Sequence, residues 1–276
     1  MASIDDLVKK LNNITREIVS GKAQRNSRAD RKMLMKRIIN HMDFDPKKRY
    51  FLVPCIRPEI FISYSVAIVG NSPTLLNHEF GEDIDDHVDI IRFNYGHING
   101  FERHCGSKTT IRFAGWPAFF GGKPKAHPDG VKNMDYYIYD KIRNMNIIVY
   151  YRPLTLRPKI LEKAKEVVKN KNKVHLIRLD NLKFFHTILS SYGIKNSKTN
   201  LQSGTVLMLL ISDLGIIPDL YGFDLKYCPD NYYYYWDMEN KKCIKMSNSH
   251  NYDDEFDIPN RLNELGIVKI WTKHKY

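Results

Sequence analysis

A short apolar segment followed by glycine, serine and proline gives the first indication of chemistry. Residues 65–69 read SVAIV, which is typical of a buried strand, and Gly70-Asn71-Ser72-Pro73 follows at once. Gly70 lets a ligand approach the backbone closely, and Ser72 before Pro73 is the pattern of a helix N-cap and first helical residue. A strand, a glycine turn and a helix N-terminus present free N–H groups to an anion. We therefore expect a phosphate or nucleotide site here.

A second expected strand, residues 89–93, ends at Asn94. Ligands of open α/β sheets bind at the carboxyl ends of the strands, so Asn94 and the Gly70 turn are expected at one edge of the sheet. Further segments with unusual composition follow in a fixed order. They are GFERHCGSKTT (100–110), NLQSGTVLMLLISDLGIIPDLYGFD (200–224), YYYYWD (232–237) and HNYDDE (250–255).

In this order the segments resemble the large, small, third and very small sialylmotifs of the eukaryotic-type sialyltransferases, family 29 of the glycosyltransferases. The resemblance covers residues 65–255, and four motifs in sequence are hard to obtain by chance. It implies an α/β fold with a Rossmann-like, mostly parallel sheet flanked by helices, of the GT-A-variant type. It also implies an inverting transfer of sialic acid from CMP-sialic acid to a hydroxyl of a glycan acceptor.

The resemblance assigns a set of donor-binding residues. Gly70, Asn71 and Ser72 would hold the phosphate and ribose, with Asn94 contributing from the next strand end. The later motifs complete the donor site with Gln202, Ser203, Gly204, Gly222, Phe223 and Tyr234. An ordinary strand–helix turn without a ligand is the alternative interpretation of the Gly70 segment.

Several positions depart from the family pattern. Gln202 replaces a hydroxyl residue of the usual Ser-Thr-Gly, whereas Ser203 keeps its hydroxyl. Asn200 stands where some relatives place a phosphate-binding tyrosine, and Asp224 replaces the usual second glycine. Tyr234 takes a histidine position, and a phenol can donate a hydrogen bond to phosphate but carries no positive charge. These departures leave open a related donor, namely another CMP-activated acidic sugar such as Kdo.

His250 is the candidate catalytic base, by its place in the very small motif. An imidazole with an unperturbed pKa of about 6.5 suits proton abstraction near neutral pH. A surface histidine in a polar loop is the alternative, and the other motifs favour the catalytic role. Glu255 follows five residues later and so shares no helix face with His250. We expect Glu255 to play a supporting, structural role.

We expect no metal and no cofactor beyond the CMP-sugar donor. CMP is a good leaving group because its phosphate needs little protonation near neutral pH, and hydrogen-bond donors can then replace a metal. The pairs Asp83 with Asp85 and Asp253 with Asp254 resemble the metal-holding carboxylates of other glycosyltransferases. The first pair lies inside the large motif, on its expected solvated loop, which argues against a metal there.

Strand and helix patterns alternate along the rest of the chain, which predicts a parallel sheet with helices on both faces. Residues 1–60 are expected to form a basic helical N-terminal extension and a proline-punctuated linker, and residues 61–276 the catalytic domain. The expected strands are residues 109–113, 146–150, 173–179, 218–223 and 267–272, the expected helices are 156–170 and 205–214, and 116–130 is expected to be a surface loop.

The chain is strongly basic, with a net charge of +12, and residues 1–50 hold 13 Lys and Arg against 6 Asp and Glu. Such a charge suits an anionic membrane surface, an acidic glycan or glycolipid acceptor, or nucleic acid, and it also suits an ordinary solvated helix face. A basic nucleic-acid-binding module is the alternative from another functional class. No RNP, KH or zinc signature supports it, so we expect no nucleic-acid partner.

The positions of the cysteines and the hydropathy of the chain indicate in which cellular compartment the protein is expected. The positions that carry the family's disulfide in the large and small motifs hold no cysteine here, which suits a reducing compartment. A substitute bridge, such as Cys105 to Cys228, stays open. No apolar run reaches the roughly 18 residues of a membrane span, and the N-terminus shows no signal region. We expect a cytoplasmic protein, either free or bound peripherally to a membrane.

Overall fold

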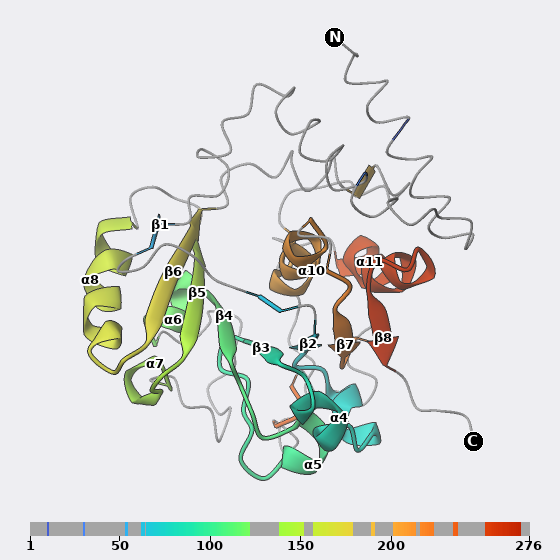
Figure 1. Ribbon diagram of the computed structural model, residues 1–276, viewed down its shortest axis with the longest axis horizontal. Coiled ribbons are helices and arrows are strands. Elements are labelled where there is room, and N and C mark those ends of the chain that lie inside the picture. The colour runs from blue at the N-terminus through green and yellow to red at the C-terminus, as the bar shows by residue number, and fades with distance from the viewer. Residues whose placement is uncertain are drawn as a thin grey trace.

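One eight-stranded sheet, with strand order β1-β6-β5-β4-β3-β2-β7-β8, forms the centre of the computed structural model (Figure 1). The structure describes residues 10, 30, 53–54, 62–63, 65–121, 138–151, 157–178, 189–190, 201–213, 216–223, 234–236 and 252–271. The parallel strands are β2 (Val66–Val69), β3 (Asp89–Phe93), β4 (Ile111–Gly115), β5 (Asn146–Tyr151), β6 (Lys173–Arg178), β7 (Asp219–Tyr221) and β8 (Lys269–Trp271). The predicted mostly parallel sheet is confirmed.

Helices cover both faces of this sheet, because its strands are apolar on both sides. Val66 and Ile68 of β2 pack on one face with α10 (Ser203–Asp213) and α11 (Tyr252–Glu264). Ala67 and Val69 point to the other face, toward α4 (Gly81–Asp85), α5 (Glu102–Cys105) and the 3₁₀ helix η1 (Pro73–Asn77). Further along that second face lie α6 (Trp116–Phe119), α7 (Ile138–Lys141) and α8 (Arg157–Val168).

The order of the strands creates a switch point between β2 and β7. From β2 the chain proceeds outward through β3, β4 and β5 to β6, and then it returns to β7 on the opposite side of β2. The connections that leave β2 and β7 therefore diverge. In open α/β sheets such a point leaves a crevice at the carboxyl ends of the strands, where ligands bind.

Three local predictions need correction. Part of the predicted linker belongs to the sheet, because β1 (Val53–Pro54) pairs antiparallel with β6. Proline is tolerated there because β1 is an edge strand. The predicted loop at 116–130 begins with the helix α6, whose Ala118 and Phe119 are buried. Asp83 and Asp85 lie in α4 rather than in a loop. Most of the predicted N-terminal extension lies outside the described residues.

None of the helices in the described ranges combines the length and the apolar character needed to cross a bilayer. α10 is the most apolar of those near the switch point, and it has eleven residues. That length corresponds to about 16 Å at 1.5 Å per residue, roughly half of a bilayer's hydrocarbon core.

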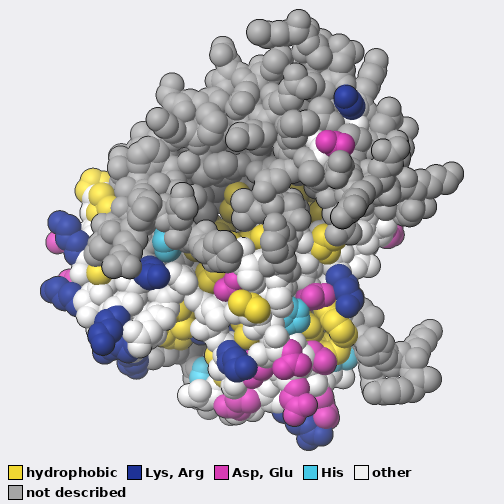
Figure 2. Space-filling model, viewed as in Figure 1, with side chains coloured by type: hydrophobic (Ala, Val, Ile, Leu, Met, Phe, Trp, Pro, Cys, Tyr) yellow, Lys and Arg dark blue, Asp and Glu magenta, His cyan; other side chains and the backbone are white. Residues whose placement is uncertain are grey.

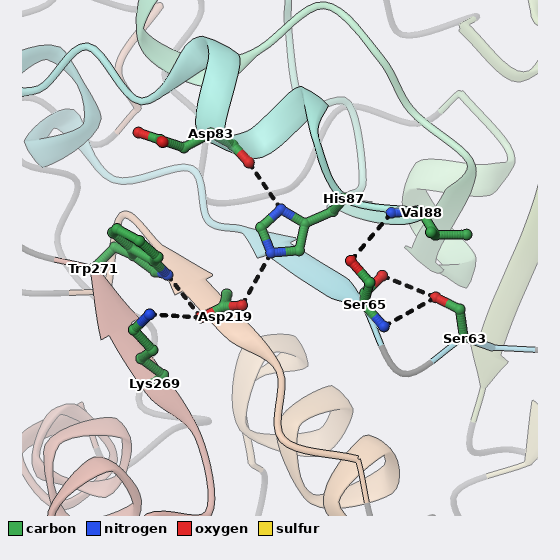
Figure 3. A network of polar contacts seen from close by, with 8 residues as sticks. All are labelled: Ser63, Ser65, Asp83, His87, Val88, Asp219, Lys269 and Trp271. Carbon is green, nitrogen blue, oxygen red and sulfur yellow. Dashed lines mark hydrogen bonds and ion pairs between the residues drawn. The ribbon is translucent and has the colours of Figure 1, made fainter.

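His87 lies at the amino edge of the sheet, where it ties the end of α4 to β7 (Figure 3). Its Nδ1 lies 2.9 Å from the carbonyl oxygen of Asp83, and its Nε2 lies 3.0 Å from Asp219 Oδ2. Both partners are acceptors, so only the doubly protonated imidazolium can donate to both. The hydrogen bond to Asp219 is the main cause that raises the pKa of His87, and it outweighs the opposing effect of burial.

Asp219, in β7, also bonds to the edge strand β8. Trp271 Nε1 donates to Asp219 Oδ1 at 2.7 Å, and Lys269 Nζ lies 3.7 Å from the same oxygen. Burial alone would raise the pKa of Asp219, but the hydrogen bonds from His87 and Trp271, together with the Lys269 charge, lower it. The network thus fastens α4, β7 and β8 at the edge opposite the Gly70 turn.

The pH dependence of stability tests this network. The folded-state pKa of His87 is raised above its unfolded value of about 6.5. Its contribution to stability is therefore fully present below the unfolded pKa and is lost as pH rises through the folded pKa. We expect wild type to lose its stability advantage over His87→Gln across that interval, measured by urea denaturation from about pH 6 to pH 9.

The matched control is His104→Gln, because the His104 ring contacts the His78 carbonyl oxygen instead. This variant leaves the contact between His87 and Asp219 in place and shows what the replacement of another histidine does to stability. A stability difference between wild type and His87→Gln that is the same at every pH would contradict the charged network.

Candidate functional site

Glycines from two neighbouring strand ends meet at the switch point. Gly70 N donates to the carbonyl oxygen of Tyr221 at 2.8 Å, and a Cβ added at Gly70 would lie 2.7 Å from Gly222 O. Gly222 has a φ of 75°, and a Cβ there would lie 2.8 Å from Leu75 Cγ. Neither position accepts a side chain, so at the carboxyl ends of β2 and β7 the two backbones approach each other with no side chain between them.

The ring of Phe223 joins this edge to the start of α10. A Cβ added at Gly70 would lie 3.1 Å from Phe223 Cε2, and one added at Gly204 would lie 3.0 Å from Phe223 Cε1. One ring therefore packs between the Gly70 turn and the first turn of α10, which is possible because glycine stands on both sides. The structure thus brings together Gly70, Gly204, Gly222 and Phe223.

The first turn of α10 contains Ser203 and Gly204, and Gln202 immediately precedes it. Glu255, in α11, is 3% exposed and accepts hydrogen bonds from Gln202 N and, at 3.3 Å, from Thr205 Oγ1. Its carboxylate therefore caps the helix end. The N–H groups of Ser203 and Gly204 are then the donors with which this helix can meet an anion.

Tyr150, at the carboxyl end of β5, reaches the same helix start. Its Oη forms a short hydrogen bond with Ser203 Oγ. The ring stacks on Phe113 with centroids 5.0 Å apart and planes 19° apart. A Cβ added at Gly115 would lie 3.0 Å from Tyr150 Oη, so glycine there makes room for the phenol. Sequence analysis missed this contact, because Tyr150 was only the end of a predicted strand.

Ser72 caps a helix, as its sequence pattern predicts, but the helix is short. Its Oγ accepts from Thr74 N at 3.3 Å and from Thr74 Oγ1 at 3.1 Å. The helix is the five-residue 3₁₀ turn η1, whose dipole is too small to hold an anion alone. The longer helix that begins at this edge is α10, and the anion site at the Gly70 turn stays a prediction. The Ser72 hydroxyl proton can still donate to a ligand.

The third motif contacts the Gly70 turn through its backbone. Tyr235 N donates to Asn71 O at 3.2 Å, and Tyr235 Oη donates to His97 O. The half-buried Tyr234 stacks on Trp236 with centroids 4.4 Å apart. Tyr234 therefore belongs to an aromatic cluster that is attached to the strand end at Asn71.

Asn94 follows β3 in the left-handed conformation, with a φ of 46°, which asparagine tolerates better than most residues. Its Oδ1 accepts from Gly115 N at 3.0 Å, and its carbonyl oxygen accepts from Tyr139 Oη at 2.7 Å. Arg112 Nη1 donates to Gly96 O at 3.0 Å and supports the same turn. With its oxygen engaged, the side chain of Asn94 has its Nδ2 amide to offer a ligand.

Two buried arginines hold the loops that follow β3, and sequence analysis missed both. Arg92 is 1% exposed and Arg112 3%. Arg92 Nη2 donates to the carbonyl oxygens of Cys105, at 2.6 Å, and Lys108, at 2.8 Å. Burial lowers the pKa of Arg112 to about 10, which leaves it charged at neutral pH. The sequence did contain a sign of these buried charges, since each of the two largely apolar strands β3 and β4 includes one arginine.

Asp85 has a structural role. It accepts hydrogen bonds from Ser107 N at 2.8 Å and from Lys108 N at 2.9 Å. Partial burial alone would raise its pKa, but the bonds from Ser107 and Lys108 lower it.

Across the ranges that the structure describes, no three His, Cys, Asp or Glu side chains are grouped to hold a metal. The side chains of Asp253 and Asp254 are not among those described, whereas Cys105 is described as a buried free thiol.

Three predicted site residues lie outside the described residues: His250, Asn200 and Asp224. Their roles stay predictions. In the chain, His250 stands two residues before α11, Asn200 three residues before α10, and Asp224 directly after Phe223.

Comparison with known proteins gives a family match that covers most of the chain. Residues 63–267 match the profile of glycosyltransferase family 29 (sialyltransferase). A beta-1,6-galactosyltransferase of Arabidopsis thaliana is 51% identical over 49 residues, which are 18% of this chain and 12% of that protein. The CMP-N-acetylneuraminate-beta-galactosamide-alpha-2,3-sialyltransferase 1 of Gallus gallus is 22% identical over 209 residues, 74% of this chain and 57% of that protein. The matches thus span less than two thirds of these relatives.

A crystal structure of a mammalian sialyltransferase has a similar fold, with a TM-score of 0.51 and 20% identity, over 75% of this chain and 68% of that one. This likeness agrees with the parallel sheet and the flanking helices. The family profile runs from just before β2 to just before β8 and includes both glycine-bearing strand ends. The chain therefore belongs to glycosyltransferase family 29, the sialyltransferase family.

Proposed function

We propose that the protein is an inverting sialyltransferase that moves sialic acid from CMP-sialic acid to a hydroxyl of a glycan. Family membership supports transferase chemistry, and one structural observation carries the location of the donor site. Gly70 and Gly204 both pack against the ring of Phe223 at the switch point, and Gly222 packs against Leu75, so the large and small motifs build a single edge. The Asn71 carbonyl holds the third motif at the same edge.

In this proposal the edge stabilises the departing CMP. The phosphate gains negative charge as the bond to the sugar breaks, so preorganised donors that face it lower the barrier. The backbone N–H groups of Ser203 and Gly204, the Ser203 hydroxyl and the Asn94 amide are the donors available for it. Asn71 and the Ser72 hydroxyl, on the neighbouring strand end, serve the ribose.

His250 is the base that removes the proton of the acceptor hydroxyl. Its motif continues directly into α11, and Glu255 of α11 caps the start of α10. The base motif and the donor motif are thus coupled through one buried carboxylate. Attack from the face opposite the departing CMP inverts the anomeric configuration, as in other single-displacement reactions at a sugar carbon.

The sequence constrains the sugar of the donor less than it constrains the CMP part. The Arabidopsis relative is named a beta-1,6-galactosyltransferase, although its 49 matched residues are 51% identical. Similarity over such a stretch is therefore compatible with different donors. Gln202, Asn200 and Asp224 depart from the family pattern at donor positions, so another CMP-activated acidic sugar such as Kdo is the second candidate.

The acceptor is proposed to be a glycan or glycolipid, with peripheral contact to an anionic membrane surface. Figure 2 shows basic side chains on the side of α7 and α8 and acidic ones over α4 and α5. The exposed basic residues include Lys141, Arg143, Lys159, Lys165, Lys169 and Lys171. Such a surface attracts anionic lipid headgroups. The cytoplasmic location stays a prediction.

Nucleotide binding tests the donor site. CMP should bind more tightly than UMP or GMP in calorimetry, and Ser203→Ala should weaken CMP binding about 10-fold or more, the expected effect of losing a hydrogen bond to a charged group. Ser212→Ala is the matched control, because Ser212 is a buried serine of the same helix and lies more than two turns away. Equal affinity for CMP, UMP and GMP would contradict a CMP-sugar donor, and a preference for UMP would point to a different sugar nucleotide.

Metal removal tests the proposed leaving-group chemistry. Transfer should continue at its full rate in excess EDTA, because hydrogen-bond donors and not a cation stabilise the phosphate. The measurement is CMP release with and without EDTA. Activity that EDTA abolishes and manganese or magnesium restores would contradict metal independence.

Replacement of His250 tests the proposed base. His250→Ala should reduce transfer about 10²- to 10⁴-fold, the usual contribution of general-base catalysis, while CMP binding stays unchanged. The wild-type rate should fall at acid pH as the imidazole takes up a proton, and this acid limb should be absent in the variant. Near-normal transfer with an unchanged acid limb would move the base to Asp253, Asp254 or Glu255.

A further inference from the structure

We propose that Tyr150 is a positioning residue for the donor phosphate and acts by orienting the hydroxyl of Ser203. Tyr150 Oη and Ser203 Oγ form a short hydrogen bond between the end of β5 and the start of α10. The two residues are half-buried. This inference rests on the proposed function, in which Ser203 contacts the phosphate of the CMP-sugar.

The chemistry of the two hydroxyls sets the direction of this bond. A phenol, with a pKa of about 10, is a much stronger acid than an aliphatic alcohol and is the better donor. When Tyr150 donates to Ser203 Oγ, the serine proton is free to turn toward a ligand. Accepting one bond also polarises the serine hydroxyl and strengthens the bond that it donates. The Ser203 proton then complements an anion at the α10 start.

The phenol is held in place from both sides. Its ring stacks on Phe113, and its Oη lies where a Cβ at Gly115 would come within 3.0 Å. Gly115 N in turn donates to Asn94 Oδ1 at 3.0 Å. Asn94, Gly115, Tyr150 and Ser203 thus form a continuous path of contacts across the ends of β3, β4 and β5 to the start of α10. A preset phenol orients Ser203 at little entropic cost.

A loss of the Tyr150 hydroxyl should affect the binding of the phosphate and not the binding of the nucleoside. Tyr150→Phe keeps the stacked ring and removes only the hydroxyl. We expect it to weaken CMP binding about 3- to 10-fold, the effect of one hydrogen bond, and to leave cytidine binding unchanged. The rate constant kcat should fall as well, because the phosphate gains charge as CMP leaves and the oriented donor matters most then.

A double-mutant cycle tests whether Tyr150 acts through Ser203. Calorimetry with CMP and with cytidine is carried out on the full chain for wild type, Tyr150→Phe, Ser203→Ala and the double variant. Because Tyr150 works through the serine hydroxyl, the double variant should bind CMP like Ser203→Ala alone. Ser212→Ala serves as the control for α10, and thermal unfolding of each variant reports on its folding.

The possible results of this cycle distinguish between different roles of Tyr150. Additive losses in the double variant would mean that the phenol contacts the ligand itself, which overturns action through Ser203. Equal losses for CMP and cytidine would make Tyr150 merely structural, and unaltered CMP binding in Tyr150→Phe would give it no role. Failure of the proposed function looks different, since wild type would then not prefer CMP over UMP. If UMP is preferred, the same cycle with UMP and uridine tests Tyr150.

Discussion

The approach of two backbone segments, where Gly70 N meets the carbonyl oxygen of Tyr221 at 2.8 Å, is the contact on which the rest of the site depends. It brings together the ends of β2 and β7, which stand 152 residues apart in the chain. The contact requires glycine at 70 and 222, because a Cβ at either position would lie within 3.0 Å of other atoms. Parallel pairing supplies the register, and the divergence of the two connections supplies the space for a ligand.

Buried polar groups keep the surrounding loops in register with that contact. Arg92 and Arg112 use backbone carbonyl groups as acceptors, which offsets part of the cost of burying a charge. The carboxylates of Asp85 and Glu255 stabilise the loops and helix ends in the opposite sense, since each accepts hydrogen bonds from backbone N–H groups. These groups are preorganised before any ligand arrives. A site of this kind stabilises developing charge without reorganising at the moment of reaction.

Local patterns predicted the parallel sheet, the Ser72 cap and the helix that begins near Ser203, because hydrophobic periodicity and cap chemistry are short-range signals. The family resemblance predicted which motifs come together. The contacts of Tyr150, Arg92 and Arg112 were beyond prediction, since each depends on which strands become neighbours and which face a side chain takes. The shortness of η1 was beyond prediction for the same reason. This five-residue 3₁₀ helix is placed by the packing of its Leu75 against Gly222, which is distant in the chain.

A crystal structure of the protein with CMP would show directly where the donor nucleotide binds. We expect the phosphate within hydrogen-bond distance of the Ser203 and Gly204 N–H groups, with the ribose beside the Gly70 turn. The amino edge, where His87 and Asp219 already use their polar atoms on each other, should remain free of nucleotide. CMP bound at any other place, or bound with its phosphate turned away from the α10 start, would contradict the assignment of the donor site to the β2–β7 switch point.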